Sequence, residues 1–594
     1  MACSNSQNVR HGDVHNQKPS DGEQLKICLE NARTDQKTVI FTLGDSDNDL
    51  IKNTSGNGKI VMVDLKTLHE EQMKHQSAKN NYPDLSEQDD IQETITKLQT
   101  RLGKSPLVKK EVFQNWGKTQ VIQVISSSPT TKEEIQKLVL AASEEGLHVR
   151  CAGSGHSWAP LFSDSKQLLI HVKDMKSDYK DGSRIRISNP QKLEVDIMTG
   201  VTTGDFKKFQ LENKLNIPAN VILDIVQMVS VVATGCHGVG RNANTPSDNV
   251  VKMRIIGSDG KLRTYTKDDK EMLQAIRANF GCFGVIFDMT LKLIPEFIVK
   301  VENRYMHLGD LFFNAENIKQ IFENNWSVEM FWFPFNSLSF FSYDPKHDRV
   351  LIRIINKESK KVKTETESYY EKKKRQDHWT QKALEIVSPH LVKHPHLTPE
   401  FAYASFRYLS NHIYPSGHDL YQELPHAVHF RHYIDLAPVN DMEFAFDLKG
   451  DFNRLLEIIQ VVVNKVHQYQ EKKEYQLNIA LEMRMMGYSE TLLCPGIIGN
   501  PDFGGSGQVL YIEVLSVVDT NGWKEFCIDV GQEWMALDGV PHLAKQWDFL
   551  PGIEDHIYKH MGQHIDAFRK QLQKSGADPK KMFLNKSLQK LLRL

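Results

Sequence analysis

The stretch VRCAGSGHSWAPLF, residues 149–162, decides how this sequence folds, because an apolar run ends there in a glycine turn. We predict a short buried strand over residues 147–152. The turn that follows, GSGHS, contains one histidine, His156. Glycines after a strand allow backbone N–H groups to face a phosphate or a planar ligand. By itself the turn fits two interpretations: a binding loop, or a structural turn with a hydrogen-bonded histidine.

The residues before this turn predict a helix. Thr131 and Glu134 have the spacing of a capping box, in which both side chains satisfy free N–H groups at a helix start. Apolar residues then recur at helical spacing, and Gly146 is placed to end the helix in a left-handed conformation. The order of elements is therefore helix, strand, glycine turn.

A second glycine-rich segment, VVATGCHGVGRNANTPSDNVV, covers residues 231–251 and contains Cys236 and His237. It offers close backbone donors and hydroxyl groups, or else forms a tight structural crossing. A hairpin is predicted next, over 250–266, because Asp259-Gly260 supplies the positive φ that such a turn needs. The segment NFGCFGVIFDMTLKLIP (279–295) predicts a further strand that ends at Pro295.

Two later segments carry charged side chains that suit a site. Glu482 and Arg484 lie two residues apart on the predicted strand LNIALEMRMM, so they share one face of it. This pair is either an internal salt bridge or part of a site. The segment GVPHLAKQW (539–547) places His542 and Lys545 in a loop, where a lysine is most often solvated.

Composition narrows the classes of function. The chain has 594 residues and a formal net charge of −2, which argues against a general nucleic-acid binder. Seven cysteines occur without CxxC spacing, so we expect neither a disulfide framework nor a metal site, and we predict a cytoplasmic protein. No run of about 18 apolar residues occurs. Membrane association is left open, and nothing in the sequence indicates it.

Taken in order, the motifs resemble one family. VRCAGSGHSWAP, VVATGCHGVG, GCFGVIFDMTLKLIP, DMEFAF, LEMRMM and PHLAK are similar to the aldonolactone oxidase group of the vanillyl-alcohol-oxidase class of flavoproteins. That group includes gulonolactone, galactonolactone and arabinonolactone oxidases and alditol oxidase. The resemblance spans about residues 110–594.

The resemblance implies an α+β fold. Its parts would be a two-lobed PCMH-type FAD-binding domain over 109–298, a substrate domain with a large antiparallel sheet over 299–545, and a return to the FAD domain over 546–594. The composition changes after Pro295, where segments rich in aromatic residues begin, and this change falls at the implied junction. We expect residues 1–108 to form a partly disordered N-terminal extension.

The resemblance also implies site residues. Bound FAD would be attached covalently through His156, and catalysis would rest on Glu482, Arg484 and Lys545. The implied cofactor-binding residues are Gly153, Ser154, Gly155, His156, Ser157, Thr234, Gly235, Cys236, His237, Gly238, Gly284, Val285 and Ile286. The sequence departs from the family pattern at three places: Ala233 replaces a common serine, Cys236 replaces a common threonine, and His-Leu-Ala-Lys replaces His-Trp-Gly-Lys.

The implied activity is FAD-dependent oxidation of a CH–OH group in a sugar-1,4-lactone or polyol. Hydride would pass to flavin N5, and oxygen would then be reduced to hydrogen peroxide. One alternative is a dehydrogenase of similar substrates that uses cytochrome c or a quinone. An alternative of another class is an inactive flavin-fold binding protein, whose functional parts would be the N-terminal extension and the charged stretch 357–377.

Overall fold

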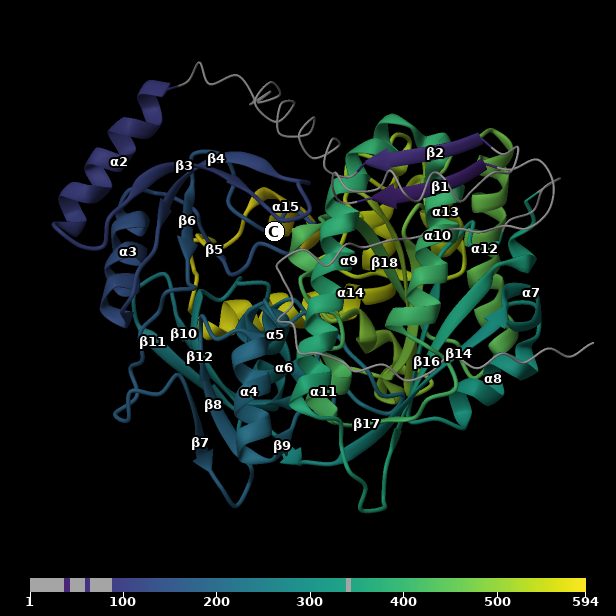
Figure 1. Ribbon diagram of the computed structural model, residues 1–594. Helices are drawn as coiled ribbons and strands as arrows, with labels where there is room; N and C mark the ends of the chain where they lie inside the picture. The colour runs from purple at the N-terminus through teal and green to yellow at the C-terminus, as the bar shows by residue number, and fades with distance from the viewer. Residues whose placement is uncertain (1–36, 43–58, 65–87, 338–342) are drawn as a thin grey trace, which may run out of the picture. The chain divides into compact units, whose positions relative to one another are not determined.

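The computed structural model describes residues 37–42, 59–64, 88–337 and 343–594 (Figure 1). The chain forms two compact units, residues 1–78 and 79–594. In the first unit, β1 (Lys37–Thr42) and β2 (Lys59–Asp64) pair in parallel. Much of the predicted N-terminal extension therefore lies outside the described residues, but its last part does not.

Helix α2 (Gln88–Leu102) lies in the region that we assigned to the extension, yet it is packed into the second unit. Ile91, Ile95 and Leu98 recur at helical spacing and are buried. They share a core cluster with Leu138 of α3 (Lys132–Glu144). This apolar stripe requires a partner surface, which explains why residues 88–102 fold rather than extend.

The first lobe of the second unit is a four-stranded sheet in the order β3-β4-β6-β5. Its strands are β3 (Lys109–Gln114), β4 (Val121–Ser127), β5 (Val149–Ala152) and β6 (Leu168–His171). The hydroxyl of Thr131 caps α3, and Gly146 has a φ of +69° after its end. The predicted order of helix, strand and glycine turn is confirmed.

The second lobe is a five-stranded antiparallel sheet in the order β11-β10-β12-β8-β7. Its strands are β7 (Ile185–Asn189), β8 (Glu194–Met198), β10 (Val250–Ile256), β11 (Leu262–Thr266) and β12 (Val285–Lys292). Helices α4 (Thr203–Asn213), α5 (Met228–Ala233) and α6 (Lys270–Arg277) belong to the same part of the chain. The predicted hairpin over 250–266 is confirmed as β10 and β11.

An eight-stranded sheet makes up most of the remaining chain, in the order β17-β14-β16-β15-β19-β20-β18-β21. Its strands are β14 (Ile298–His307), β15 (Ser327–Trp332), β16 (Arg349–Lys357), β17 (Leu420–Glu423), β18 (Val439–Phe446), β19 (Ala480–Gly487), β20 (Gln508–Val517) and β21 (Val540–Pro541). Every pairing in it is antiparallel. The expected large antiparallel sheet is confirmed.

The two faces of this sheet differ in chemistry because side chains alternate along each strand. Leu481 and Met483 of β19 point into a core shared with α8 (Ala315–Glu323), α12 (Phe452–Glu471) and α13 (Trp523–Ala536). Glu482 and Arg484 therefore project from the opposite face. Helices cover one face, and the other is left for a polar site.

The other helices frame the sheet and close the chain. They are α7 (Leu308–Leu311), α9 (Glu367–Lys393), α10 (Thr398–Tyr408), α11 (Leu424–Val428), α14 (Ile553–Ser575) and α15 (Lys586–Leu591). The charged stretch 357–377 runs from the end of β16 into α9, in agreement with a largely solvated helix or loop. Among the described residues, no helix is both long and apolar enough to cross a membrane.

The C-terminal segment returns to the first lobe (Figure 1). The amide of Val149 donates to the Met582 carbonyl at 2.9 Å. The buried guanidinium of Arg150 donates to the Phe583 carbonyl at 2.7 Å. Strand β5, which leads into the GSGHS turn, is therefore fixed by residues more than 400 positions away in sequence. The domain boundaries at 109, 299 and 546 stay predictions.

The packing of α2 predicts a stability effect. Replacing Leu98, which is fully buried, by Ala should destabilise this unit by about 2–5 kcal/mol, because a cavity remains in the core. Leu107, 70% exposed, is the matched control, and Leu107→Ala should cost about 0.5 kcal/mol or less. Thermal unfolding of the full chain measures both. Equal midpoints for the two variants would contradict the assignment of α2 to the folded body.

Candidate active site

The GSGHS turn packs closely against the start of α5. Gly155 has a φ of +71°, which L-residues rarely adopt. A Cβ on Gly153 would lie 2.6 Å from the Ser230 hydroxyl, so only glycine allows this close approach. The Ser154 hydroxyl donates to the Ile225 carbonyl at 2.8 Å. The two glycine-rich motifs of the sequence thus lie side by side.

His156 has the environment of a neutral imidazole. Its ring stacks on Trp116, with centroids 4.6 Å apart. Burial lowers the pKa of His156 to about 4, and the charge of Lys545 contributes to the shift. Its Nδ1 atom is buried and has no hydrogen-bond partner among the described residues. A neutral ring with a free nitrogen is chemically suited to bonding an electrophilic carbon.

The ATGCHG turn is held as tightly as the first. Gly235 has a φ of +65°, and the Thr234 hydroxyl donates to the Ser230 carbonyl at 2.8 Å. A Cβ on Gly238 would lie 2.0 Å from the Asn220 carbonyl oxygen. Burial raises the pKa of the Cys236 thiol, so this thiol stays protonated at neutral pH. Cys236 is therefore a packing residue in this turn rather than a thiolate nucleophile.

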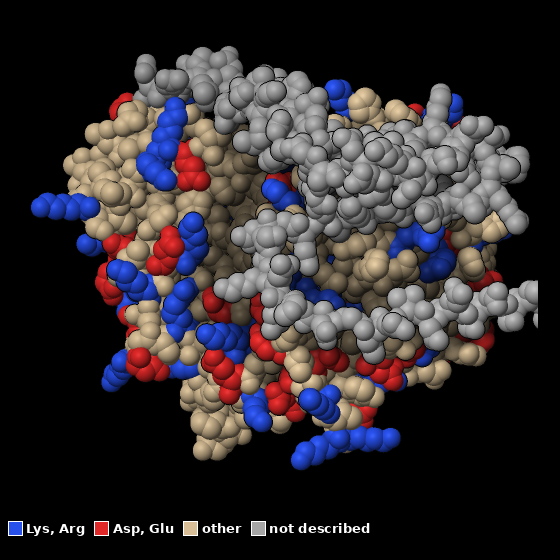
Figure 2. Space-filling view, viewed as in Figure 1, with Lys and Arg blue, Asp and Glu red and all other residues tan. Residues whose placement is uncertain are grey.

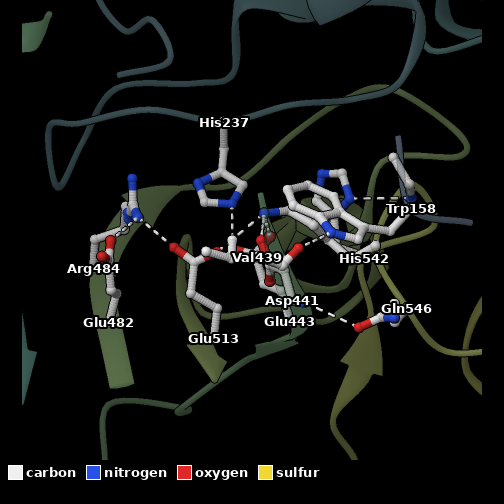
Figure 3. A network of polar contacts seen from close by, with 12 residues as sticks. Trp158, His237, Val439, Asp441, Glu443, Glu482, Arg484, Glu513, His542 and Gln546 are labelled. Atoms are coloured by element: carbon white, nitrogen blue, oxygen red, sulfur yellow. Dashed lines mark hydrogen bonds and ion pairs between the residues drawn. The ribbon is translucent and has the colours of Figure 1, made fainter. Parts of the chain in front are cut away.

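His237 leaves the turn and enters the charged side of the large sheet (Figure 3). Its Nε2 lies 2.5 Å from Oε1 of Glu443, and its ring stacks on Tyr511 at 3.8 Å. Its Nδ1 is buried and has no partner in the described part of the chain. The carboxylate orients the ring and leaves one nitrogen for another group.

The PHLAK loop ties both turns to the sheet. The His542 amide donates to the Glu443 carbonyl at 2.9 Å, and the His542 Nε2 lies 3.2 Å from the Gly235 carbonyl. From the first turn, the Trp158 amide donates to the Ala544 carbonyl at 2.9 Å, while the Trp158 indole donates to the Val439 carbonyl at 2.7 Å. Trp158, which the sequence left without a role, thus connects the GSGHS turn to this loop and to β18.

Lys545 and Arg484 are the cations of a buried network whose acids Asp441, Glu443 and Glu513 are labelled in Figure 3. Lys545 contacts Asp441 directly and lies 3.1 Å from Glu513. Arg484 lies 2.7 Å from Glu513, which therefore bridges the two cations. Glu482 lies 3.5 Å from Arg484. The structure thus brings all three predicted catalytic residues into one network.

The network continues along the sheet in both directions. Glu482 pairs with Arg431 at 2.8 Å, and Arg484 approaches Glu329 at 3.9 Å. Glu329 in turn pairs with Arg353 of β16 at 2.8 Å. Each of these carboxylates is nine-tenths or more buried, so each depends on a nearby cation.

Proton affinities differ within the network. Burial raises the pKa of Asp441 well above its ordinary value, and Glu513 and Glu443 add to the shift. Burial opposes ionisation of Glu443, but His237 and Lys545 outweigh it and hold its pKa well below the ordinary range. Burial likewise opposes the charge of Lys545, but the surrounding carboxylates raise its pKa well above the ordinary value. Lys545 is therefore charged, and Asp441 is the acid that most readily holds a proton.

His237, Glu443 and His542 place possible metal-ligand atoms within 4.8 Å of one another. Both ring nitrogens of His542 already bond to the backbone: one to the Gly235 carbonyl and the other to the Ala544 amide. The Lys545 ammonium lies 3.9 Å from Glu443. These contacts define a hydrogen-bonded cluster rather than an open ligand set.

Gly284, Val285 and Ile286 occupy a different environment. They lie at the start of β12, where a Cβ on Gly284 would meet the Ile256 carbonyl at 2.1 Å. The side chains of Val285 and Ile286 are buried in two core clusters. Close packing of β12 on β10 explains this glycine, and a cofactor role for the three residues stays a prediction.

Sequence reasoning assigned no role to several residues of the network. Asp441, Glu443 and Glu513 were missed, as were Glu329 and Arg431. The available signal was an acid inside an otherwise apolar strand, in DMEFAF and QVLYIEVLSVV. Two acids at positions i and i+2 share a face, as Glu482 and Arg484 do.

Comparison with known families agrees with this architecture. The profile of the FAD binding domain family matches residues 126–266, which contain both glycine turns. Two lobes of this kind, joined to a large antiparallel sheet, define an FAD-dependent flavoprotein. The D-arabinono-1,4-lactone oxidase profile matches residues 289–591, half of the chain. The chain belongs to the D-arabinono-1,4-lactone oxidase family.

Curated relatives are distant and match only in part. A D-arabinono-1,4-lactone oxidase of Debaryomyces hansenii is 25% identical over 38% of this chain and 42% of its own length. An L-gulonolactone oxidase of Bos taurus is 24% identical, covering 37% and 48%. An L-gulono-1,4-lactone dehydrogenase of Mycobacterium tuberculosis is 25% identical, covering 38% and 50%. The chain thus spans about half the length of these relatives.

Solved structures show the same fold. A solvent-stable cholesterol oxidase aligns with a TM-score of 0.65 at 18% identity, covering 83% of this chain and 99% of that chain. The cholesterol oxidase from B. sterolicum aligns with a TM-score of 0.67 at 15% identity, with the same coverage. At these identities the likeness concerns the fold alone.

The residues of the two turns fit FAD. Close packing at Gly153 and Gly238 fixes the two turns, and the buried, unpartnered nitrogens of His156 and His237 are left for the polar groups of a ligand. Ser157 and Thr234 lie in the same turns. FAD is the cofactor of this fold, and the contribution of each residue stays a prediction.

The charged network predicts a stability effect at Lys545. Lys545→Met leaves Asp441 without its cation and Glu513 with Arg484 alone, and it should destabilise the protein by about 3–5 kcal/mol. Adding Asp441→Asn removes one of the uncompensated groups, so the double variant should unfold at a higher temperature than the single variant. Lys580→Met, at an exposed position, is the control. A double variant that is no more stable than Lys545→Met would contradict this account.

Proposed function

We propose that this protein oxidises a CH–OH group of a sugar-1,4-lactone or related polyol, with FAD as the bound electron acceptor. One observation carries the proposal. The buried network contains four polar atoms with no hydrogen-bond partner among the described residues: His237 Nδ1, Asp441 Oδ1, Glu443 Oε2 and Glu329 Oε1. Buried polar atoms require partners, and a polyhydroxyl ligand supplies several hydroxyl groups that can each donate and accept.

The cations of the site have an electrostatic role. Bound FAD supplies a two-electron acceptor for hydride. Arg484 and Lys545 are held by carboxylates in fixed positions, so they stabilise negative charge without reorganising. Glu482, anchored by Arg431, orients substrate hydroxyls.

His237 is suited to accept the hydroxyl proton of the substrate. Its Nε2 is engaged by Glu443, so the unpartnered Nδ1 is the ring nitrogen left to accept a proton. After proton transfer, the ionised Glu443 stabilises the imidazolium. This role extends the cofactor contact that the sequence assigned to His237.

We propose that His156 forms a covalent bond to the flavin. Support comes from its free and buried Nδ1 and from the neutral ring that its lowered pKa implies. The surrounding turn is fixed by Gly153, Ser154 and Trp158, so the ring is positioned before any bond forms.

Molecular oxygen is the final acceptor that we propose, and a cytochrome or quinone is the alternative. Relatives of both kinds match, since two are named as oxidases and one as a dehydrogenase. The proposed location is the cytoplasm, supported by the free cysteines Cys151, Cys236, Cys282, Cys494 and Cys527. Fractionation of cells that express the chain tests the location.

The activity is tested by a substrate panel of aldonolactones, alditols and aldoses. We expect a sugar lactone to bleach the bound FAD anaerobically and to release hydrogen peroxide in air. Arg484→Met should slow anaerobic bleaching roughly 100- to 1,000-fold, because a fixed charge is lost. Arg304→Met, at a half-exposed position on β14, should leave the bleaching rate unchanged. Bleaching by no member of the panel would refute the function, and fast dye reduction without peroxide would favour the dehydrogenase.

The covalent bond is tested by His156→Ala. Acid-precipitated wild-type protein should keep its flavin fluorescence on a denaturing gel, whereas His156→Ala should lose it. His171→Ala is the control, because His171 also lies in the first lobe and pairs with Glu111. Retention of flavin in precipitated His156→Ala protein would exclude this attachment point.

A further inference from the structure

A pocket that is partly open to solvent lies beside the segment 429–432. Helices α4, α9 and α11 contribute to it, together with strands β14, β16 and β17. The lining residues that carry the argument are Lys207, Asn303, Arg353, Lys373, Lys374 and His432. Figure 2 shows Lys and Arg side chains recessed in the surface where α9 and α11 lie in Figure 1.

The lining of this pocket contains four Lys and Arg side chains and no acidic residue. Three histidines also line it, and burial lowers the pKa of His426 and of His429 to about 3, so these two are neutral. Lys374 pairs with Glu371 at 2.8 Å, and Lys373 pairs with Asp377 at 2.8 Å. Neither of these acids lines the pocket.

Lys207 differs from Lys373 and Lys374, because no acid among the described residues pairs with it. It comes from α4, in the second lobe, and is only partly exposed. It makes no ion pair and no hydrogen bond with any described residue. Burial lowers the pKa of Lys207 to about 8. The charge of Asp224 raises this pKa, and the charge of Lys374 lowers it. A nearby anion would stabilise the charged form of this amine.

Two polar groups in the pocket are buried and unpartnered. His432 is 8% exposed and Asn303 is 4% exposed. Nδ1 of His432 lies 2.8 Å from Oδ2 of Asp377. Nε2 of the same ring has no partner among the described residues. Oδ1 of Asn303 is likewise unpartnered, although its amide nitrogen reaches the Pro415 carbonyl. Each atom is a place for a ligand polar group.

Aromatic rings give these cations fixed positions. Phe430 lies beneath the Arg353 guanidinium at 3.9 Å, and Tyr414 lies beneath the Lys373 ammonium at 4.5 Å. Tyr370 and His426 stack at 3.6 Å. The pocket is therefore built from ordered side chains rather than from mobile surface lysines.

The pocket is separate from the proposed active site but adjoins it. Phe430 and His432 face the pocket, whereas Arg431 between them pairs with Glu482. Arg353 lines the pocket and also pairs with Glu329 of the network.

We propose that this pocket binds a small hydroxylated anion, a compound with one carboxylate or phosphate group and several hydroxyls. The acidic group pairs with Lys207 and Lys374, and a hydroxyl donates to Asn303. This inference is independent of the proposed oxidation, since its residues are not those assigned to catalysis.

The probes are D-glucose 6-phosphate, D-gluconate and inorganic phosphate, with D-glucose as the neutral comparison. Binding to the full-length, FAD-loaded protein is measured by calorimetry at constant ionic strength. We expect at least one of the two hydroxylated anions to bind and D-glucose not to bind. The stronger anion identifies the acidic group as phosphate or carboxylate.

Matched variants locate the binding. Lys207→Met should weaken binding about tenfold or more, because a charge-assisted contact is lost. Lys208→Met is the control, since Lys208 is the next residue of α4, is exposed, and removes the same charge. Asn303→Leu should weaken binding of the hydroxylated anion but not of inorganic phosphate.

Three results would overturn the proposal. One is that neither hydroxylated anion binds the folded, FAD-loaded protein. Another is that Lys207→Met and Lys208→Met weaken binding equally, which would indicate only a general charge effect. The third is that Lys207→Met leaves the affinity unchanged. Unfolding temperatures of the variants, measured without ligand, establish that each is folded.

Discussion

The ammonium group of Lys545 is the interaction on which the rest of the site depends. It contacts Asp441 and lies near Glu513 and Glu443, three carboxylates that are otherwise buried in the large sheet. Three acids so close together in a medium of low dielectric constant depend on the cations around them, and Lys545 is the cation that all three share. The loop that carries Lys545 must therefore dock on the sheet.

Docking of that loop places the two glycine turns. Hydrogen bonds from Trp158 to Ala544 and from His542 to Gly235 join each turn to the loop. One electrostatic requirement in the sheet thus positions two loops of another domain. The hydrogen bond from the Trp158 amide is accepted by the backbone of the PHLAK segment, so it depends little on the side chains beside Lys545.

Local signals in the sequence were sufficient for much of the fold. The cap at Thr131, the turn at Gly260 and the alternation around Glu482 each depend on neighbouring residues, so they could be predicted. Helix α2 was placed in an extension because residues 1–108 are mostly polar and its partner, α3, lies beyond two strands. Glu443 and Glu513 were missed for a related reason: their partners come from other strands and loops, and no local spacing shows which charges will meet.

The contact between the C-terminal segment and β5 has a consequence for biosynthesis. Hydrogen bonds from Val149 and Arg150 to Met582 and Phe583 complete the first lobe. A ribosome exposes the N-terminal residues long before these, so the lobe cannot be completed before residue 583 has emerged. The turn that carries His156 follows β5 directly. This turn therefore gains its full structural support late in synthesis, although it lies near the start of the folded unit.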